Sequence, residues 1–178
     1  MRRFVWASVL LAFSLTAHAQ EKEKKDPFDI SETTKLTKEL GVSTVSEVGT
    51  LEGRAKQLFE TGDCKAAIEA LDQYARKANW LANLIAAGIQ PYYSASYHDR
   101  ENFSHSKLQV LIPIENKANE YKEKRNRAMV MRAECLVKLG QKQEAVALLV
   151  GALNLISIND DEWWTRAKNQ LFSLIEVR

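Results

Sequence analysis

The chain has 178 residues, of which 25 are lysine or arginine and 23 are aspartate or glutamate, so its formal net charge is +2. This near balance argues against a nucleic-acid-binding protein, which usually has a basic face or a basic overall composition. Glycine and proline are scarce, and the apolar residues recur at helical rather than alternating spacing. The composition therefore predicts an all-α protein whose length suits one domain.

The N-terminal segment, residues 1–19, has the pattern of a secretory signal peptide. Two arginines precede a 13-residue, mostly apolar run, and Ala17-His18-Ala19 offers small residues for cleavage before Gln20. The run is short for a membrane span, which needs about 20 apolar residues, so an uncleaved anchor is the less favoured alternative. No later segment is apolar enough to span a membrane. We expect a periplasmic or secreted product whose remaining chain has 23 basic and 23 acidic residues.

Residues 20–45 are expected to form a charged, flexible leader that contains one short helix. The segment from residue 20 to residue 29 has many charges and no helical periodicity. Ser31 is placed to cap a helix that ends at Gly41 in a left-handed conformation. The helical domain then extends from residue 46 to residue 178.

This domain contains one sequence pattern twice, at residues 54–71 and 132–149. A gap-free alignment pairs six identical residues, and in each copy a glycine separates two stretches of helical periodicity. The pattern predicts a helix-turn-helix unit that occurs twice. In the first copy, Asp63 is placed to cap a second helix that continues to about residue 87. The identical pairs are Arg54/Arg132, Ala55/Ala133, Leu58/Leu136, Gly62/Gly140, Ala67/Ala145 and Leu71/Leu149.

Between the two copies, residues 88–106 lose the helical pattern and contain a cluster of aromatic and histidine side chains. A loop of this length in a compact domain is often functional. Two interpretations stay open: the aromatic side chains seal the end of a long helix pair, or they form a surface for a ligand or partner. The candidate partner-binding residues here are Tyr92, Tyr93, Tyr97, His98 and Phe103.

A short helix is expected over residues 106–112, and Pro113 is expected to begin a second helix that continues to Leu139. The first half of this second helix is polar and is expected to project or to lie on the surface. Its basic residues alternate with glutamates, as on a solvated helix face, although contact with an anionic surface is an alternative. These candidates are Lys122, Lys124, Arg125 and Arg127.

The second copy continues into a helix over residues 142–156, and a final helix from about Glu162 is expected to close the stack. Cys64 and Cys135 occupy different places in the two copies, and a disulfide requires Cα atoms within about 7 Å, so buried free thiols are the favoured interpretation over a disulfide. His98 and His105 have no recognised metal-ligand spacing. We therefore predict no metal, no cofactor and no catalytic residues.

The repeated unit resembles the tetratricopeptide repeat family. Small residues at Ala55 and Ala67, large apolar residues at Leu58 and Leu71 and the turn glycine at Gly62 match that motif, as do their counterparts in the second copy. The resemblance covers about 70 residues. It implies an α-solenoid of antiparallel helix pairs with a C-terminal capping helix, and a role in protein interaction. Arg54 and Arg132 then either cover apolar surface with their stems or face a ligand on the concave side.

The favoured function is a non-catalytic, exported helical-repeat protein that binds a protein or peptide in the cell envelope, with homo-oligomerisation possible in principle. The alternative is a binder of anionic polymer or lipid that uses the basic residues from 122 to 127. A third and least supported hypothesis is an enzyme that depends on a metal or on the two histidines. The sequence does not identify the partner.

Overall fold

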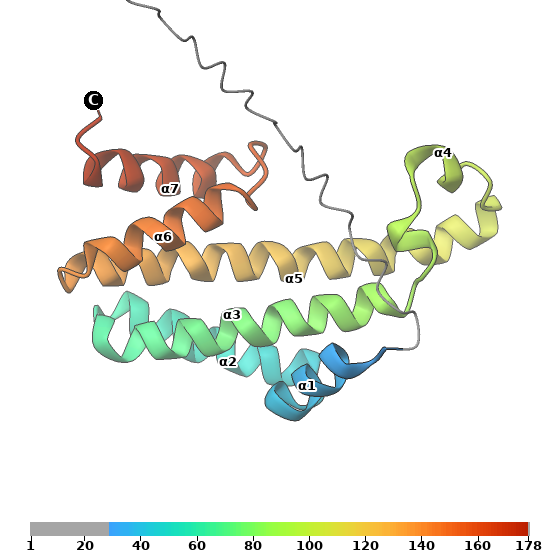
Figure 1. Ribbon diagram of the computed structural model, residues 1–178, viewed down its shortest axis with the longest axis horizontal. Helices are drawn as coiled ribbons and strands as arrows, with labels where there is room; N and C mark the ends of the chain where they lie inside the picture. The colour runs from blue at the N-terminus through green and yellow to red at the C-terminus, as the bar shows by residue number, and fades with distance from the viewer. Residues whose placement is uncertain (1–28, 178) are drawn as a thin grey trace, which may run out of the picture.

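A computed structural model describes residues 29–177, and this part of the chain is all-helical, with seven α-helices and one short 3-10 helix (Figure 1). The predicted signal peptide and most of the leader, residues 1–28, lie outside the described residues. Two long helices, α3 (Cys64–Ala87) and α5 (His105–Lys138), run side by side through the centre of the molecule. Four of the other five α-helices pack on one of these two.

The short N-terminal helix is present as α1 (Ser31–Leu40) and packs against α3. Gly41 ends it with a φ of 66°, as expected, and its carbonyl accepts a hydrogen bond from Trp80 Nε1 at 2.9 Å. The predicted cap at Ser31 is wrong: Ser31 is the first helical residue, and its backbone N–H donates to Asp29 Oδ1. The Asp29 carboxylate, two residues earlier, thus accepts a hydrogen bond from one of the backbone N–H groups that have no partner inside the helix.

The first copy of the repeat forms α2 (Val45–Glu60) and α3, which pack against each other. Thr44 caps α2 by accepting a hydrogen bond from the Glu47 backbone N–H. Gly62 has a φ of 79°, a left-handed conformation that costs glycine little, and Asp63 caps α3 through the Ala66 backbone N–H at 3.1 Å. These local features confirm the predicted turn.

The prediction of two helices around Pro113 is wrong, because α5 is one continuous helix of 34 residues with Pro113 inside it. Proline removes a single backbone donor and its φ suits a helix, so the interruption is local. The polar half was expected to project or to lie on the surface, and it lies on the surface: of residues 117–127, only Ala118, Tyr121 and Asn126 are buried. The projecting part comprises the first turns of α5 together with the short helix α4 (Tyr97–Arg100), which extend beyond the end of α3 (Figure 1).

The second copy forms the last part of α5 and α6 (Lys142–Leu153), and Gly140 at the turn has a φ of 80°. Helix α6 ends three residues before the predicted limit. The final helix, α7 (Asp161–Leu174), packs on α6 and α5 and begins one residue before its predicted start. Asp160 precedes this helix, but its side chain makes no capping hydrogen bond there.

Each copy of the repeat has its own core cluster, built on the shared small and large residues. Ala55, Ala67 and Leu71 belong to the first cluster, and their counterparts Ala133, Ala145 and Leu149 belong to the second. All six side chains have no exposed surface. The shared positions of the pattern are therefore the positions at which helices pack closely.

A disulfide joins Cys64 and Cys135, so the prediction of free thiols is wrong. Cys64 opens α3, Cys135 lies near the end of α5, and the side-by-side packing of these helices brings their Cα atoms to 4.9 Å. That separation lies within the range for a bridge. The two places in the repeat differ, as expected, but the packing of α3 on α5 brings them together.

None of the helices among residues 29–177 combines the length and the apolar character that crossing a membrane requires.

Candidate functional site

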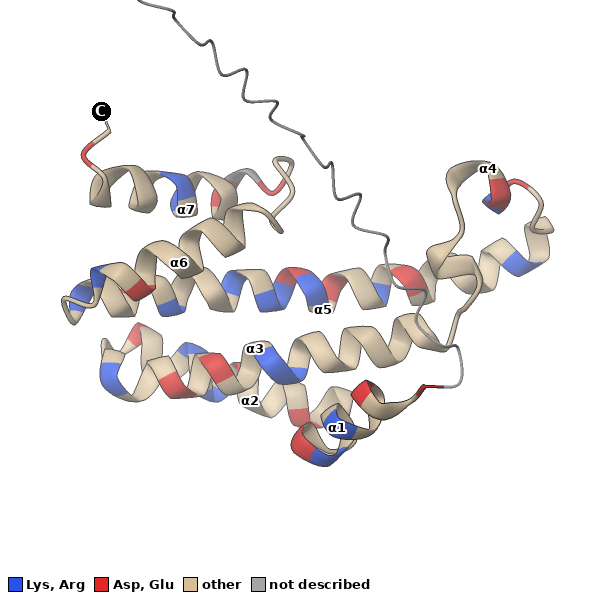
Figure 2. Ribbon diagram, viewed as in Figure 1, with Lys and Arg blue, Asp and Glu red and all other residues tan. Residues whose placement is uncertain are grey.

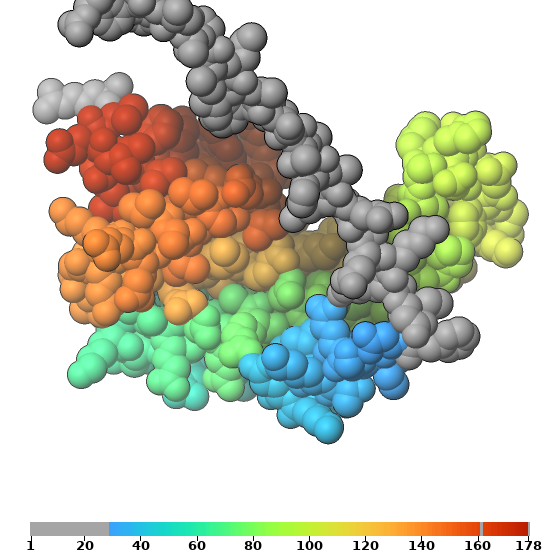
Figure 3. Space-filling view, in the orientation of Figure 1, coloured from blue at the N-terminus to red at the C-terminus, as the bar shows by residue number. Residues whose placement is uncertain are grey.

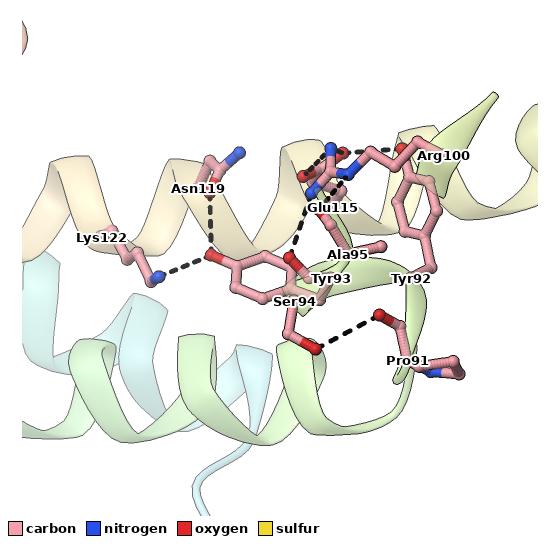
Figure 4. A network of polar contacts seen from close by, with 9 residues as sticks. All are labelled: Pro91, Tyr92, Tyr93, Ser94, Ala95, Arg100, Glu115, Asn119 and Lys122. Atoms are coloured by element: carbon pink, nitrogen blue, oxygen red, sulfur yellow. Dashed lines mark hydrogen bonds and ion pairs between the residues drawn. The ribbon is translucent and has the colours of Figure 1, made fainter. Parts of the chain in front are cut away.

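The aromatic segment between the two copies is anchored to α5 through Tyr92, which lies in the 3-10 helix Tyr92–Ser94 (Figure 4). Tyr92 is 3% exposed, and its hydroxyl donates a hydrogen bond to Glu115 Oε2 at 2.9 Å. Burial, and then this hydrogen bond, raise the pKa of Tyr92. The ring of Phe103 meets the Tyr92 ring edge to face, with 5.5 Å between centroids. Tyr92 and Phe103 thus hold the segment to the body of the protein.

Arg100 completes this anchor from α4. Its guanidinium lies 4.6 Å from the centre of the Tyr92 ring and 2.9 Å from Glu115 Oε1. It also donates to the backbone carbonyls of Tyr93 and Ala95, at 3.0 and 3.2 Å. A segment that contains only two very short helices is therefore ordered by one cation, one carboxylate and two rings.

The other candidates in this segment lie toward solvent to different degrees. Tyr97 is 84% exposed, and the exposed His98 side chain has its Nδ1 3.5 Å from Glu101 Oε2. Tyr93 is half-buried and accepts a hydrogen bond from Lys122 Nζ at 2.5 Å. Tyr97 and His98 are thus available to a partner, whereas Tyr92 and Phe103 pack against the end of the long helix pair. Within residues 29–177, no three His, Cys, Asp or Glu side chains are placed to hold a metal ion.

Basic and acidic residues alternate along the middle of α5 (Figure 2). The four basic candidates there do not form one surface, although they lie close together in sequence. Lys124 pairs with Glu52 of α2 at 2.9 Å and with Glu120 at 3.3 Å. Arg127 lies 3.3 Å from Asp160, just before α7. Lys122 and Arg125 instead line a groove on another side of α5. The half-helix thus uses its charges to contact three different neighbours.

Glu52 gives the fold a predicted acid sensitivity. Burial alone would raise its pKa, but hydrogen bonds from Lys56 and Lys124 together lower the pKa below the ordinary 4.5. A carboxyl whose folded pKa is lowered contributes stability above its unfolded pKa and loses it as the pH falls through the folded value. We expect the free energy of unfolding to fall with acidification in that window, and to fall less in Glu52→Gln, as measured by urea denaturation at several pH values.

The matched control is Glu60→Gln, at an exposed position in the same helix. Its free energy of unfolding should depend on pH as that of the wild type does. Equal profiles for Glu52→Gln and the wild type would show that Glu52 does not carry the effect.

The groove lies between α3 on one side and α6 with the α6–α7 connection on the other, and α5 forms its floor. In the space-filling view, atoms of α5 are recessed between α6 and α3 (Figure 3). The groove contains two hollows. One, here called the amide hollow, has a volume of about 520 Å³ and is lined by Asn83, Asn119, Lys122, Arg125, Asn126 and Asp160 among others.

The second, here called the apolar hollow, has a volume of about 280 Å³. It includes Ala75, Asn79, Arg125, Met129, Leu148 and Leu155 in its lining. Arg125 and Leu155 line both hollows, so the two adjoin within one groove. The groove thus offers hydrogen-bonding side chains at one end and apolar contact at the other.

The two arginines shared by the repeat copies have different surroundings. Arg54 is exposed on α2, whereas Arg132 is half-buried, pairs with Asp72 and lines the apolar hollow. The equivalence of these residues in sequence therefore does not extend to their contacts.

The sequence interpretation missed the asparagines of the groove. Asn79 and Asn83 lie four residues apart on α3, and Asn119 and Asn126 lie seven apart on α5. Each spacing places the pair on one face of its helix. Asparagine is a poor helix former, so this spacing within long helices is a signal that could have indicated a polar surface.

Comparison of the chain with family models, with curated proteins and with solved structures gives no match. The proposals below therefore rest on the residues and their arrangement.

Proposed function

We propose that the protein is a non-catalytic helical-repeat module that holds a segment of a partner protein or peptide in the groove between α3, α5 and α6. The observation that carries the proposal is the groove itself, which is open, consists of two adjoining hollows and is lined by both amide and apolar side chains. Sites that orient a ligand combine apolar contact with a few placed polar groups.

Repetition supports this proposal. Two helix-turn-helix units with equivalent buried positions pack in succession, and stacked units of this kind create extended binding surfaces. The resemblance to tetratricopeptide repeats, and with it a solenoid of antiparallel pairs, is part of the same proposal. Helix α7 would serve as its capping helix.

Export is a further part of the proposal. The pattern of residues 1–19 suggests a signal peptide, and the disulfide between Cys64 and Cys135 fits an oxidising compartment, where such bonds persist. We place the protein in the periplasm or outside the cell. The anionic-surface alternative has less support, because Lys124 and Arg127 pair with carboxylates of their own chain.

A steric block of the groove tests the function. A phage-displayed library of random peptides is selected on the wild-type protein, and the affinity of a selected peptide is measured for two variants by fluorescence anisotropy. Asn83→Trp fills the amide hollow from α3, so we expect it to weaken binding at least about tenfold, or about 1.4 kcal/mol.

Gln73→Trp is the control, since this residue is exposed on another face of α3. It should bind as the wild type does. Selection of no binding peptide, or equal weakening in the two variants, would argue against a peptide-binding groove.

A further inference from the structure

Arg125 occupies the junction of the amide hollow and the apolar hollow. It projects from α5, the helix that forms the groove floor. An inference about Arg125 rests on the proposed function, since it concerns what a peptide in this groove must present at its middle.

The guanidinium of Arg125 is held in place by two asparagines. Its Nη1 donates to Asn79 Oδ1 at 2.5 Å, and its Nε and Nη2 donate to Asn126 Oδ1 at 3.0 and 2.9 Å. Asn126 is only 4% exposed, and its own Nδ2 donates to the Leu155 carbonyl at 3.0 Å. These contacts use three of the five N–H groups of an arginine and leave two for a ligand.

The carboxylates in the groove lining lie next to arginines other than Arg125, and two of them share one arginine. Asp160 and Glu123 lie 3.3 and 3.8 Å from Arg127, and Asp72 pairs with Arg132. Arg125 has the neutral amides as its hydrogen-bond partners, and it forms no ion pair with a carboxylate whose side chain the structure describes. Its charge is therefore not paired directly with a carboxylate in the groove.

Lys122 lies one turn before Arg125 on the same face of α5 and lines the same hollow. It donates to the neutral Tyr93 hydroxyl, and among the described residues it too has no carboxylate partner. Partial burial removes water from around the Arg125 guanidinium and lowers its pKa. An oxyanion bound here would replace the missing solvation.

The hollows on the two sides of Arg125 indicate whether the oxyanion lies within the ligand chain or at its end. A chain that fills both hollows passes over Arg125 at its middle, so the oxyanion lies on a side chain rather than at a chain end. Ala75, Met129 and Leu148 on one side of Arg125 favour an apolar ligand residue. The asparagines on the other side favour hydrogen bonds to the ligand backbone.

We infer that the groove binds an acidic peptide segment in which an internal aspartate or glutamate carboxylate is held by the free N–H groups of Arg125 and by Lys122, with an apolar residue beside it in the apolar hollow. The planar guanidinium offers paired donors that match a carboxylate. The asparagines hold these donors in place before the ligand arrives.

The test uses peptides from the selection on the wild-type protein, and the first readout is their composition. Acidic residues next to an apolar residue should be enriched. One selected peptide is then made in three forms: the internal acid with an amidated C-terminus, the matching amide (Gln or Asn) with an amidated C-terminus, and the matching amide with a free C-terminal carboxylate. We expect the first to bind roughly tenfold or more tightly than the other two.

Two protein variants complete the cycle. Arg125→Gln and Lys122→Gln should each reduce the difference between the acidic and amide peptides, and Arg125→Gln should nearly abolish it. Arg54→Gln removes the same charge from an exposed position outside the groove and should leave the difference unchanged. Circular dichroism checks that each variant is folded. If Arg125→Gln does not fold, the peptide series on the wild-type protein still tests the inference.

The outcomes separate the two proposals. Equal binding of the acidic and amide peptides would overturn the carboxylate site and leave the peptide-binding function standing. Restored affinity in the free-acid form would place the carboxylate at a chain end and overturn the inference. Equal losses in Arg54→Gln and Arg125→Gln would indicate a general charge effect, and binding of no peptide at all would overturn the function itself.

Discussion

Replacing both cysteines, Cys64→Ala with Cys135→Ala, is expected to lower the free energy of unfolding by about 4 kcal/mol. The two residues are 71 apart in sequence, so their bond closes a long loop and removes much conformational freedom from the unfolded chain. Both side chains are at least 95% buried, and alanine fills most of their volume, so the folded helices should stay in place.

Urea denaturation with and without a reductant measures this effect. The wild type should lose a similar amount of stability in the presence of reductant, and the double variant should be insensitive to it. A wild-type protein with the same unfolding midpoint in both conditions, or mass spectrometry showing two free thiols after purification, would contradict the disulfide.

Enlarging the small residue that the two copies share, by Ala55→Leu or Ala133→Leu, should destabilise the protein by about 1–3 kcal/mol in each case. Both alanines have no exposed surface and lie where helices pack closely, so extra methyl groups must displace a neighbouring helix. Thermal and urea denaturation measure the loss, which should be similar for the two variants because the positions are equivalent.

Ala147→Leu is the matched control, since Ala147 is exposed on α6. It should be close to neutral. Wild-type stability in both core variants would contradict the equivalent close packing of the two copies. A similar loss of stability in the control would show that leucine destabilises these helices for a reason other than overpacking.

Features that depend on neighbouring residues could be predicted from the sequence. The turn at Gly62 and Asp63 needs only a residue that tolerates positive φ and a side chain that reaches the next helix start, and the turn at Gly140 follows from the same pattern. Buried alanines and leucines at helical spacing indicated the packed faces for the same reason.

Features that depend on packing between distant segments were missed. The disulfide requires that the start of α3 meet the end of α5, and neither cysteine has a local pattern that indicates this. Pro113 weakens a helix locally, but α5 continues through it. The groove asparagines were overlooked because their role depends on contacts with Arg125. In the sequence, Arg125 is one of several basic residues that alternate with glutamates, so nothing distinguished it.

The bond between Cys64 and Cys135 also makes a covalent ring of the chain between them. This ring contains α3, α5 as far as residue 135, and the projecting segment with α4. Cleavage of one peptide bond in that exposed segment would open the ring without separating the two fragments. The disulfide would still join α3 and α5 at the end opposite the cleaved segment, so a nicked molecule could keep the groove between them.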